Sequence, residues 1–403
     1  MSQCRLCSSN AIEVFFEQAR YPIWGGPVVP PEQAPQIKYG KLQIGICSDC
    51  GYIMLISPTP EVLRNLLYDG FYSSSNPFVE DPDTIIDART SQLLDFIEPI
   101  FKLDMVSVLE IGAYDGQFLY QLRKRGWQVF GCEPNPIGQL AAQRYGMDIK
   151  QAYFETGLYT PSSFDLIVAR FVLEHVPNPI EFLQAVWTTL KPGGYVVLDM
   201  PDGESRVLNR VLGNLVTEHV SYFGAHTLKL ALAQAHFIQI ELLPYLGGLA
   251  VKARRGEIET TEASLIANPK ILQLLASIRS YSKDMTKKLD VLQTIIERLL
   301  SEGKRIVIYG ANTQTLDYLI SGAIRAEQIE YIIDDDSYKQ GCYLMGTNLM
   351  VYSPNKLVEK PVDVLVVSAY FSQDKIVAAF RDKLGRKRAI VKFYPTPEVV
   401  GSR

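Results

Sequence analysis

The chain has 403 residues, of which 47% are hydrophobic and 10% aromatic. This length and composition predict a globular protein of two or three domains with ordinary hydrophobic cores. The formal net charge is −4, and Lys and Arg form only short clusters such as residues 252–255, which excludes the basic stripe typical of a nucleic-acid-binding protein. No basic N-terminal segment precedes an apolar core, and no apolar run reaches the length of a membrane span. We therefore expect a cytoplasmic protein that binds neither nucleic acid nor membranes.

Four of the six cysteines form two Cys-x-x-Cys pairs near the start of the chain, Cys4 with Cys7 and Cys47 with Cys50. Two such pairs, brought together in a reducing compartment, form a tetrahedral thiolate site that favours zinc. Four protein ligands leave no coordination position open, so we expect a structural ion. The long interval between the pairs leaves disulfides, free thiols or another metal as alternatives.

The first hundred residues are expected to form a small module and a connector. Residues 1–60 form the predicted zinc-binding module, with Pro-rich connections and a hairpin around residues 38–56. Residues 61–105 read as a helical connector, interrupted by an aromatic and hydroxyl-rich loop at 68–77 that includes Tyr72. Such a loop either covers a ligand or is a solvated connection.

The run from Val108 to Gly116 predicts an apolar strand that turns through two glycines, Gly112 and Gly116, into a helix beginning near Gln117. Glycine lets the backbone approach a ligand closely, and the helix start offers unpaired amides. A second strand, residues 127–132, ends in Glu133, whose carboxylate can accept hydrogen bonds from both ribose hydroxyls. The pattern therefore predicts a nucleoside site.

Acidic residues in this loop narrow the choice of nucleoside. The G-x-G-x-x-G spacing of dinucleotide sites is absent, while Glu110 ends the strand and Asp115 lies inside the turn. These carboxylates would repel a pyrophosphate and attract a cationic sulfonium with an ammonium group. The predicted cofactor-binding residues are Glu110, Gly112, Ala113, Asp115, Gly116, Glu133, Pro134 and Arg170.

Further strands complete an α/β domain at residues 106–255. Residues 164–170 predict a fourth strand, and residues 190–198 predict a helix end, a turn and a fifth strand. Strands near 238–243 and 248–252 end the domain. The order and spacing resemble class I S-adenosylmethionine methyltransferases, which implies S-adenosylmethionine as the cofactor. The alternative is a generic Rossmann-like domain that binds another ligand.

The rest of the chain predicts a helical bridge and a second α/β domain. Apolar residues recur at helical spacing through residues 256–303 until Gly303 ends the pattern, which favours a core or bridging helix. Residues 304–403 predict a Rossmann-like domain with Asp334 at a strand end. Its Gly-Ala-Asn-Thr-Gln loop is a weak phosphate motif, so we expect a substrate or packing role before a second dinucleotide.

A Glu-His pair, Glu218 and His219, lies in the segment 214–228, which follows a predicted strand end at 200–202. Substrates meet cofactors at such strand ends in open α/β sheets, and imidazole titrates near neutrality. The pair therefore suggests acid–base catalysis, although a Glu-His dipeptide taken by itself is usually structural. The same two readings apply to His175, which follows the fourth strand.

In order, these features resemble the sugar C-methyltransferases of deoxysugar biosynthesis over almost the whole chain. The likeness rests on the four cysteines, residues 68–75, 110–116, 133–134, 190–194 and 218–223, and the helical bridge into a second α/β unit. It implies an α/β fold with an N-terminal zinc module, a central methyltransferase domain and a C-terminal Rossmann-like domain. It also implies methylation of a nucleotide-linked 4-keto-6-deoxyhexose beside the ketone, typically at C3. By this resemblance His219 is the base, Glu218 its neighbour in the site and Tyr72 a substrate contact.

The implied chemistry is removal of a proton beside a ketone, followed by attack of the enolate carbon on the sulfonium methyl group. The family usually has a tyrosine two residues before the Glu-His pair, whereas this chain has Val216. Tyr222 or another donor would then have to stabilise the enolate. The alternatives are an O- or N-methyltransferase of a sugar or other small metabolite, and a noncatalytic relative that binds the cofactor. The pattern is compatible with a monomer and with a homo-oligomer.

Overall fold

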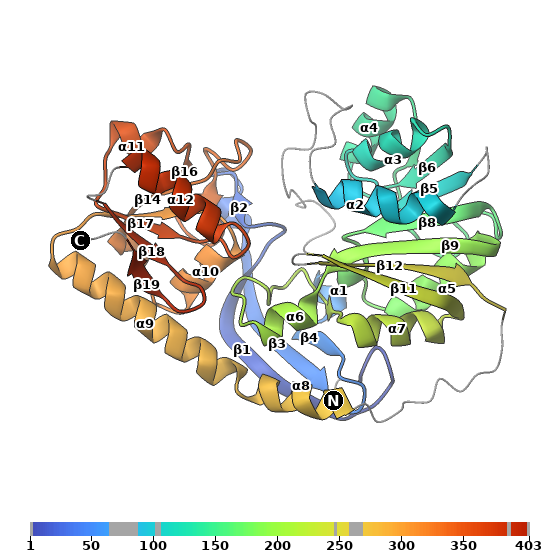
Figure 1. Ribbon diagram of the computed structural model, residues 1–403, viewed down its shortest axis with the longest axis horizontal. Coiled ribbons are helices and arrows are strands. Elements are labelled where there is room, and N and C mark those ends of the chain that lie inside the picture. Colours follow the sequence, from blue (N-terminus) through green and yellow to red (C-terminus); the bar gives the residue numbers. More distant parts are fainter. Residues whose placement is uncertain are drawn as a thin grey trace.

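The computed structural model describes residues 3–63, 88–100, 106–245, 248–257, 269–384 and 388–400. Figure 1 shows a central α/β domain on the right, a C-terminal α/β domain on the left, and an N-terminal module with a long helix joining them below. The α/β class and the two Rossmann-like sheets expected from the sequence are confirmed.

The N-terminal module is an antiparallel sheet of order β1-β3-β4-β10. Its strands β3 (Lys38–Cys47) and β4 (Ile53–Ser57) form the predicted hairpin. The sequence pattern missed β1 (Ile12–Ile23), because two register shifts interrupt its period of two. Strand β10 (Ser221–Tyr222) comes from far along the chain and pairs with Met54 and Ile53 of β4. A separate short pair joins β2 (Val28–Val29) to β15 (Tyr343–Leu344).

The central domain is a seven-stranded sheet of order β11-β12-β9-β8-β5-β6-β7. Strands β5 to β9 run parallel, and β11 and β12 are antiparallel. The central strands β5 and β8 are largely buried on both faces, which explains their nearly continuous apolar sequences, whereas Asp148 and Lys150 of the edge strand β7 are exposed. The strands are β5 (Ser107–Ile111), β6 (Gln128–Cys132), β7 (Asp148–Lys150), β8 (Phe164–Arg170), β9 (Leu190–Pro201), β11 (Phe237–Tyr245) and β12 (Gly248–Arg255).

Helices cover both faces of the central sheet. Helices α2, α3 and α4 pack on one face, and α5 and α7 pack on the other (Figure 1). The helical elements of this part of the chain are α1 (Pro60–Leu63), α2 (Ala88–Ile97), η3 (Glu98–Ile100), α3 (Gln117–Arg123), α4 (Ile137–Tyr145), η4 (Leu173–His175), α5 (Pro179–Thr189), α6 (Gly203–Leu208) and α7 (Ala225–Gln234). The predicted helix end is confirmed, because α5 ends at Thr189 with Leu190 as its C-cap. The separate turn predicted after it is wrong, because β9 already begins at Leu190, opposite Phe164, with an irregular register before Leu166.

The helical bridge consists of α8 (Pro269–Arg279) and α9 (Tyr281–Ser301). Met285, Leu292, Ile296 and Leu299 are buried on one stripe of α9, as the helical spacing predicted. The C-terminal sheet has the order β16-β14-β13-β17-β18-β19. The elements of the C-terminal domain are β13 (Ile306–Tyr309), α10 (Thr313–Ile320), η5 (Ala326–Gln328), β14 (Ile329–Ile333), β16 (Val351–Tyr352), α11 (Lys356–Glu359), β17 (Val364–Val367), α12 (Gln373–Leu384), β18 (Ala389–Lys392) and β19 (Glu398–Val400). The short helix η1 (Ala34–Gln36) belongs to the N-terminal module.

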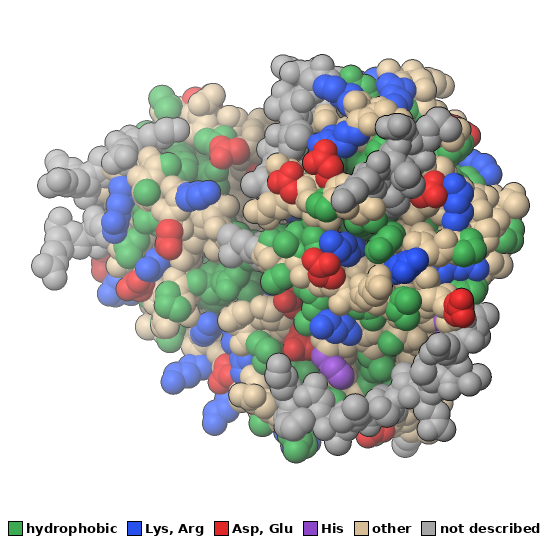
Figure 2. All heavy atoms as spheres, turned by 45° about the vertical axis from the view of Figure 1, so that its right-hand side comes forward, with side chains coloured by type: hydrophobic (Ala, Val, Ile, Leu, Met, Phe, Trp, Pro, Cys, Tyr) green, Lys and Arg blue, Asp and Glu red, His purple; other side chains and the backbone are tan. Residues whose placement is uncertain are grey.

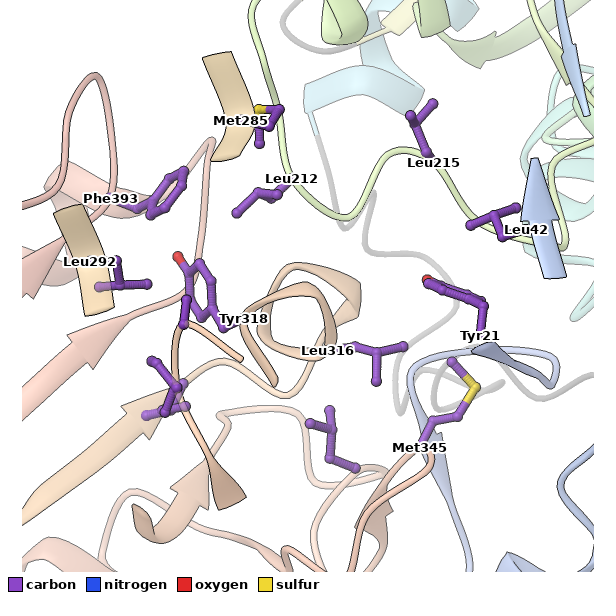
Figure 3. Close-up of a cluster of buried hydrophobic side chains, with 14 of the residues drawn as sticks. Tyr21, Leu42, Leu212, Leu215, Met285, Leu292, Leu316, Tyr318, Met345 and Phe393 are labelled. Carbon is purple, nitrogen blue, oxygen red and sulfur yellow. The ribbon is translucent and has the colours of Figure 1, made fainter. Parts of the chain in front are cut away.

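One hydrophobic core crosses the domain borders (Figure 3). It joins Tyr21 of β1, Leu212 and Leu215 of the loop after α6, Leu292 of α9 and Tyr318 of α10. Leu212 and Leu215 of this loop pack against the N-terminal module, the bridging helix and the C-terminal domain. These contacts hold the loop in place from several sides. The loop leads directly to Glu218 and His219.

The surface carries both signs of charge. Figure 2 shows Lys and Arg side chains interspersed with Asp and Glu over the visible face. Among the helices that the structure describes, none combines the length and the apolar character needed to cross a bilayer.

Candidate active site

The loop after β5 folds onto the end of β6. The amides of Gly112 and Ala113 donate to the Cys132 carbonyl at 2.8 and 3.2 Å. Gly112 and Gly116 have φ angles of +73° and +70°, in the left-handed region that glycine adopts without strain. Gly116 is the N-cap of α3, so the helix start faces this loop. The loop therefore brings close backbone and the start of α3 together after β5.

Glu133 lies across this loop with its carboxylate held by two backbone amides. Oε2 accepts from the Tyr114 amide at 3.1 Å, and Oε1 accepts from the Asn135 amide at 2.8 Å. The side chain is buried, and burial raises its pKa above the ordinary value. Pro134 is half-buried beside it. A carboxylate has about four acceptor positions, so two remain for hydroxyl groups of a ligand.

The other two predicted carboxylates are both affected by the charge of Arg170. Glu110 is buried, its Oε2 has no hydrogen-bond partner among the described residues, and burial raises its pKa to about 8. Asp115 accepts from the Gln117 amide at 3.1 Å, and its pKa is also raised by burial. The charge of Arg170 opposes both shifts, and its guanidinium lies 4.6 Å from the ring centre of Phe118. An orphaned buried acceptor is the kind of group that a cationic ligand would satisfy.

The ion pairs of Asp199 at this edge of the sheet were not predicted. Asp199, at 1% exposure, accepts from Nε and Nη2 of Arg89, the latter at 2.6 Å, and from the Tyr245 hydroxyl. The Arg170 Nε lies 3.4 Å from the same carboxylate. Arg89 also lies over the Phe171 ring at 3.9 Å. These contacts hold α2 against the ends of β8 and β9. Because the partners lie far apart in the sequence, no local pattern predicts the contacts.

The segment with the Glu-His pair is bound to η4, which follows β8. The Val220 amide donates to the Glu174 carbonyl at 2.9 Å, and His175 Nδ1 lies 2.8 Å from the Glu218 carbonyl oxygen. A Cβ atom placed on Gly112 would lie 2.6 Å from the Val172 side chain, just before η4. The Glu-His pair is thus joined through η4 to the loop after β5, residues 112–116, which is the predicted cofactor loop.

The His219 side chain lies close to two aromatic rings and one carboxyl group. Its ring centre is 5.0 Å from that of His175 and 6.0 Å from that of Tyr222. The side-chain ligand atoms of Glu174, His175 and His219 lie within 4.8 Å of one another. Burial lowers the pKa of His219 well below 6.5, and the charges of His175 and Arg206 lower it further. The imidazole is therefore neutral at physiological pH, the form that accepts a proton.

Glu218 and Tyr222, the residues predicted to lie beside His219, form hydrogen bonds with backbone groups. Glu218 Oε2 accepts from the Gly26 amide at 3.2 Å, and burial raises the pKa of this carboxyl. The Tyr222 hydroxyl donates to the Val216 carbonyl and accepts from the Val216 amide, both at 3.0 Å. Tyr222 therefore supports the loop at the position where the family has tyrosine. Tyr72, with the rest of the predicted covering loop, lies outside the described residues.

The N-terminal module contacts this segment directly. Arg5, between the first two cysteines, donates to the Leu55 carbonyl at 2.9 Å and to the Val220 carbonyl. The Tyr52 hydroxyl donates to Ser221 Oγ at 2.5 Å in the buried interior. These bonds extend the β4–β10 pairing on both sides. The cysteine module therefore supports the residue that follows His219.

The two cysteine pairs meet in space. Cys4 Sγ lies 3.7 Å from Cys50 Sγ, and Cys7 Sγ lies 3.5 Å from Cys47 Sγ. These separations exceed a disulfide bond of about 2.05 Å, and all four thiols are free. Thiolates at tetrahedral positions about 2.3 Å from a zinc ion stand roughly 3.7 Å apart. The donor set and its spacing fit zinc.

We predict that Gly112→Ala destabilises the protein more than Gly126→Ala. Both positions have positive φ, so both substitutions should cost about 1–2 kcal/mol in backbone strain. Only the Gly112 methyl group would clash with Val172, since a Cβ at Gly126 meets nothing within 4 Å. Thermal unfolding of the two variants measures the difference. Equal melting temperatures would show that the cofactor loop does not pack against η4.

Comparisons with known proteins agree with this geometry. A family model described as "Methyltransferase domain" matches residues 84–241, and one described as "C-methyltransferase C-terminal domain" matches residues 252–395. The C-methyltransferase NovU of Streptomyces niveus is 22% identical over 100% of this chain and 97% of its own length. The ubiquinone biosynthesis O-methyltransferase of Colwellia psychrerythraea is 33% identical, over 23% of this chain and 40% of its own length.

Among solved structures, an S-adenosylmethionine-dependent methyltransferase from Mesorhizobium loti covers 40% of this chain with 18% identity and a TM-score of 0.35. The two family models together cover the central and C-terminal domains, and the match to NovU extends through the N-terminal module as well. The chain is a methyltransferase of the S-adenosylmethionine-dependent type, and it is similar to C-methyltransferases through its C-terminal domain and over its full length.

Proposed function

We propose that this enzyme methylates a carbon atom of a nucleotide-linked keto-deoxysugar and that His219 is the base that activates this carbon. The observation that carries the proposal is the place of His219 against η4: its ring lies 5.0 Å from that of His175, and the next residue, Val220, donates to the Glu174 carbonyl. Val172, just before η4, lies close to Gly112 of the loop after β5. The full-length similarity to a C-methyltransferase supports transfer to carbon. The sugar substrate follows from the family that the sequence resembles.

A C–H bond needs activation before it can accept a methyl group. His219 takes the proton from the carbon beside the ketone, and the bonding electron pair moves into an enolate. The enolate carbon then forms a bond to the sulfonium methyl group, and the carbon–sulfur bond breaks to leave a neutral thioether. The proton on His219 passes to water after transfer. A neutral imidazole suits the first step because it has a free electron pair.

The enolate oxygen needs a hydrogen-bond donor. Val216 occupies the family's tyrosine position, and it is buried. We propose that Tyr222 serves as this donor by exchanging its bond to the Val216 carbonyl for one to the substrate. Glu218 holds the segment to Gly26 beside the base. Tyr72 stays a predicted substrate contact.

For the cofactor, we propose that Glu133 binds the ribose and that Glu110, with its unpartnered oxygen, faces the ammonium group of the amino-acid tail. At Gly112, Ala113 and Gly116 the backbone approaches the cofactor closely, and Asp115 and Pro134 line the loop. The positive charge of Arg170 offsets part of the negative charge of Glu110 and Asp115. Burial raises the pKa of Glu110, Asp115 and Glu133, and a bound cation would favour the charged form of each carboxylate.

We predict that Glu133→Ala weakens binding of S-adenosylhomocysteine by about 1.5–3 kcal/mol, because a charged acceptor for the ribose hydroxyls is lost. Isothermal titration calorimetry on the full chain measures the affinity. Glu155→Ala, an exposed glutamate, is the control and should bind normally. Unchanged affinity of Glu133→Ala would remove the ribose assignment.

We also propose that Cys4, Cys7, Cys47 and Cys50 hold one structural zinc ion. Cys47→Ser should lose the metal and lower the yield of folded protein, because the small module then lacks its tetrahedral centre. Cys342→Ser, outside the cluster, should keep one zinc per chain. Elemental analysis of protein purified without chelators gives the count, and a wild-type protein without zinc would contradict the assignment.

His219→Asn should bind the cofactor almost normally but reduce turnover by roughly 10² to 10⁴, the range for loss of a general base. It should also abolish exchange of the substrate carbon proton in deuterated water. His236→Asn is the matched control, since asparagine tolerates the φ of +65° at that position.

Mass analysis with labelled S-adenosylmethionine and a panel of nucleotide-linked keto sugars provides both measurements. Exchange and methylation at wild-type rates in His219→Asn would show that this histidine is structural. Methylation of oxygen or nitrogen without carbon exchange would instead establish the O- or N-methyltransferase alternative.

A further inference from the structure

Glu174 is a buried carboxyl group close to the candidate base. Its side chain is 3% exposed, and neither of its oxygens has a partner among the described residues. Leaving a buried polar group unpaired costs about 1–3 kcal/mol, and more when the group is charged. Such a group in a folded protein therefore calls for an explanation, such as a catalytic role.

The candidate base lies beside this carboxyl group. The ligand atoms of Glu174, His175 and His219 are within 4.8 Å of one another. His175 is already engaged through Nδ1 with the Glu218 carbonyl oxygen. The backbone keeps Glu174 and His219 together, because the Glu174 carbonyl accepts from the amide of Val220 at 2.9 Å. A small side-chain rotation would bring the carboxylate into hydrogen-bond contact with the His219 ring.

We propose that Glu174 is a positioning residue for His219: its carboxylate accepts the imidazole N–H that faces away from the substrate. This bond fixes the tautomer whose other nitrogen is free to take the carbon proton, and it stabilises the resulting imidazolium. The carboxylate itself takes no proton in the step. The inference rests on the proposed function, in which His219 is the base.

The surroundings of His219 explain why a partner is needed. Burial and the nearby cationic group of Arg206 lower the pKa of His219, which keeps it neutral but makes it a weak base. A carboxylate close to the ring opposes this loss, as in other carboxylate–histidine pairs. Glu174 could not be identified from the sequence, because no pattern near residues 174–175 indicates that His219, far along the chain, lies beside this carboxyl group.

The charges around Glu174 set its pH dependence. Burial raises its pKa to about 8, so the carboxylate forms as the pH rises through that value. Arg89 of α2 and Arg206 of α6 favour the ionised form, and Asp199 of β9 opposes it. In the part of the chain that the structure describes, the other titratable groups facing this cluster are His175, Glu218, His219 and Tyr222. Methylation should therefore rise with pH through about 8 in the wild type.

The first test needs no substrate. Nitrogen NMR of the full chain with ¹⁵N-labelled histidine observes only four side chains, and a His219→Asn variant assigns the relevant signals. We expect His219 to adopt one neutral tautomer in the wild type above pH 8. In Glu174→Gln the amide can donate to the ring, so the tautomer should shift, whereas Glu181→Gln should match the wild type. Unshifted His226 and His236 signals would show that the variant is folded. An unchanged His219 tautomer in Glu174→Gln would overturn the proposal.

The second test uses a sugar that the wild type methylates. Glu174→Gln should lower kcat about 10-fold or more with little change in KM, and it should lose the rise in rate through pH 8. Glu174→Asp, which keeps the carboxylate, should recover part of both. A wild-type kcat and pH profile in Glu174→Gln would overturn the proposal. So would a second metal ion per chain in the wild type that Glu174→Gln loses, because Glu174, His175 and His219 would then be metal ligands. If the tautomer shifts but the wild type methylates no keto sugar, the proposed function fails and the Glu174–His219 pair stands.

Discussion

The pairing of β10 with β4 is the contact on which the candidate active site depends. A two-residue strand cannot persist alone, so Ser221 and Tyr222 take their position from the hairpin of the N-terminal module. Arg5 and Tyr52 strengthen this pairing with bonds to Val220 and Ser221. His219 lies two residues before the strand. Its place relative to the cofactor loop is therefore set by a module at the other end of the chain.

The C-terminal domain holds the same segment from the opposite direction. The Gly213 amide donates to Asp317 at 2.7 Å, and the Thr313 hydroxyl donates to the Gly213 carbonyl at 2.8 Å. A Cβ at Gly213 would lie 2.5 Å from the Gln314 amide nitrogen, so this close approach needs glycine. The segment that carries the candidate base is thus shared by three parts of the chain. This arrangement explains why the similarity to NovU, which extends over all of them, says more about function than similarity to the central domain alone.

Much of the fold could be predicted from the sequence, for identifiable reasons. The strands around the cofactor loop are continuous apolar runs, and Gly112 and Gly116 mark the turn between strand and helix. The cysteine pairs predicted a cluster that the structure brings together. The roles given to individual site residues, from Glu133 to Tyr72, stay predictions.

The missed features depend on residues that are distant in sequence. Strand β10 is too short for any period to show, and β1 is interrupted by two bulges. The Arg89–Asp199 ion pair and the approach of Glu174 to His219 appear only when separate loops meet. Tyr222 looked like a free donor in the sequence, but its hydroxyl is bonded to Val216. Local patterns contain no information about such partners.

Hydrogen exchange with mass spectrometry on Arg5→Ala tests most directly whether the N-terminal module positions the catalytic segment. Arg5 bridges the Leu55 and Val220 carbonyls, so its loss should loosen β10 from β4. We expect faster exchange in residues 215–222, with the amides of β5 and β8 as protected as in the wild type. Unchanged exchange of residues 215–222 in a variant that has lost both bonds would contradict this account.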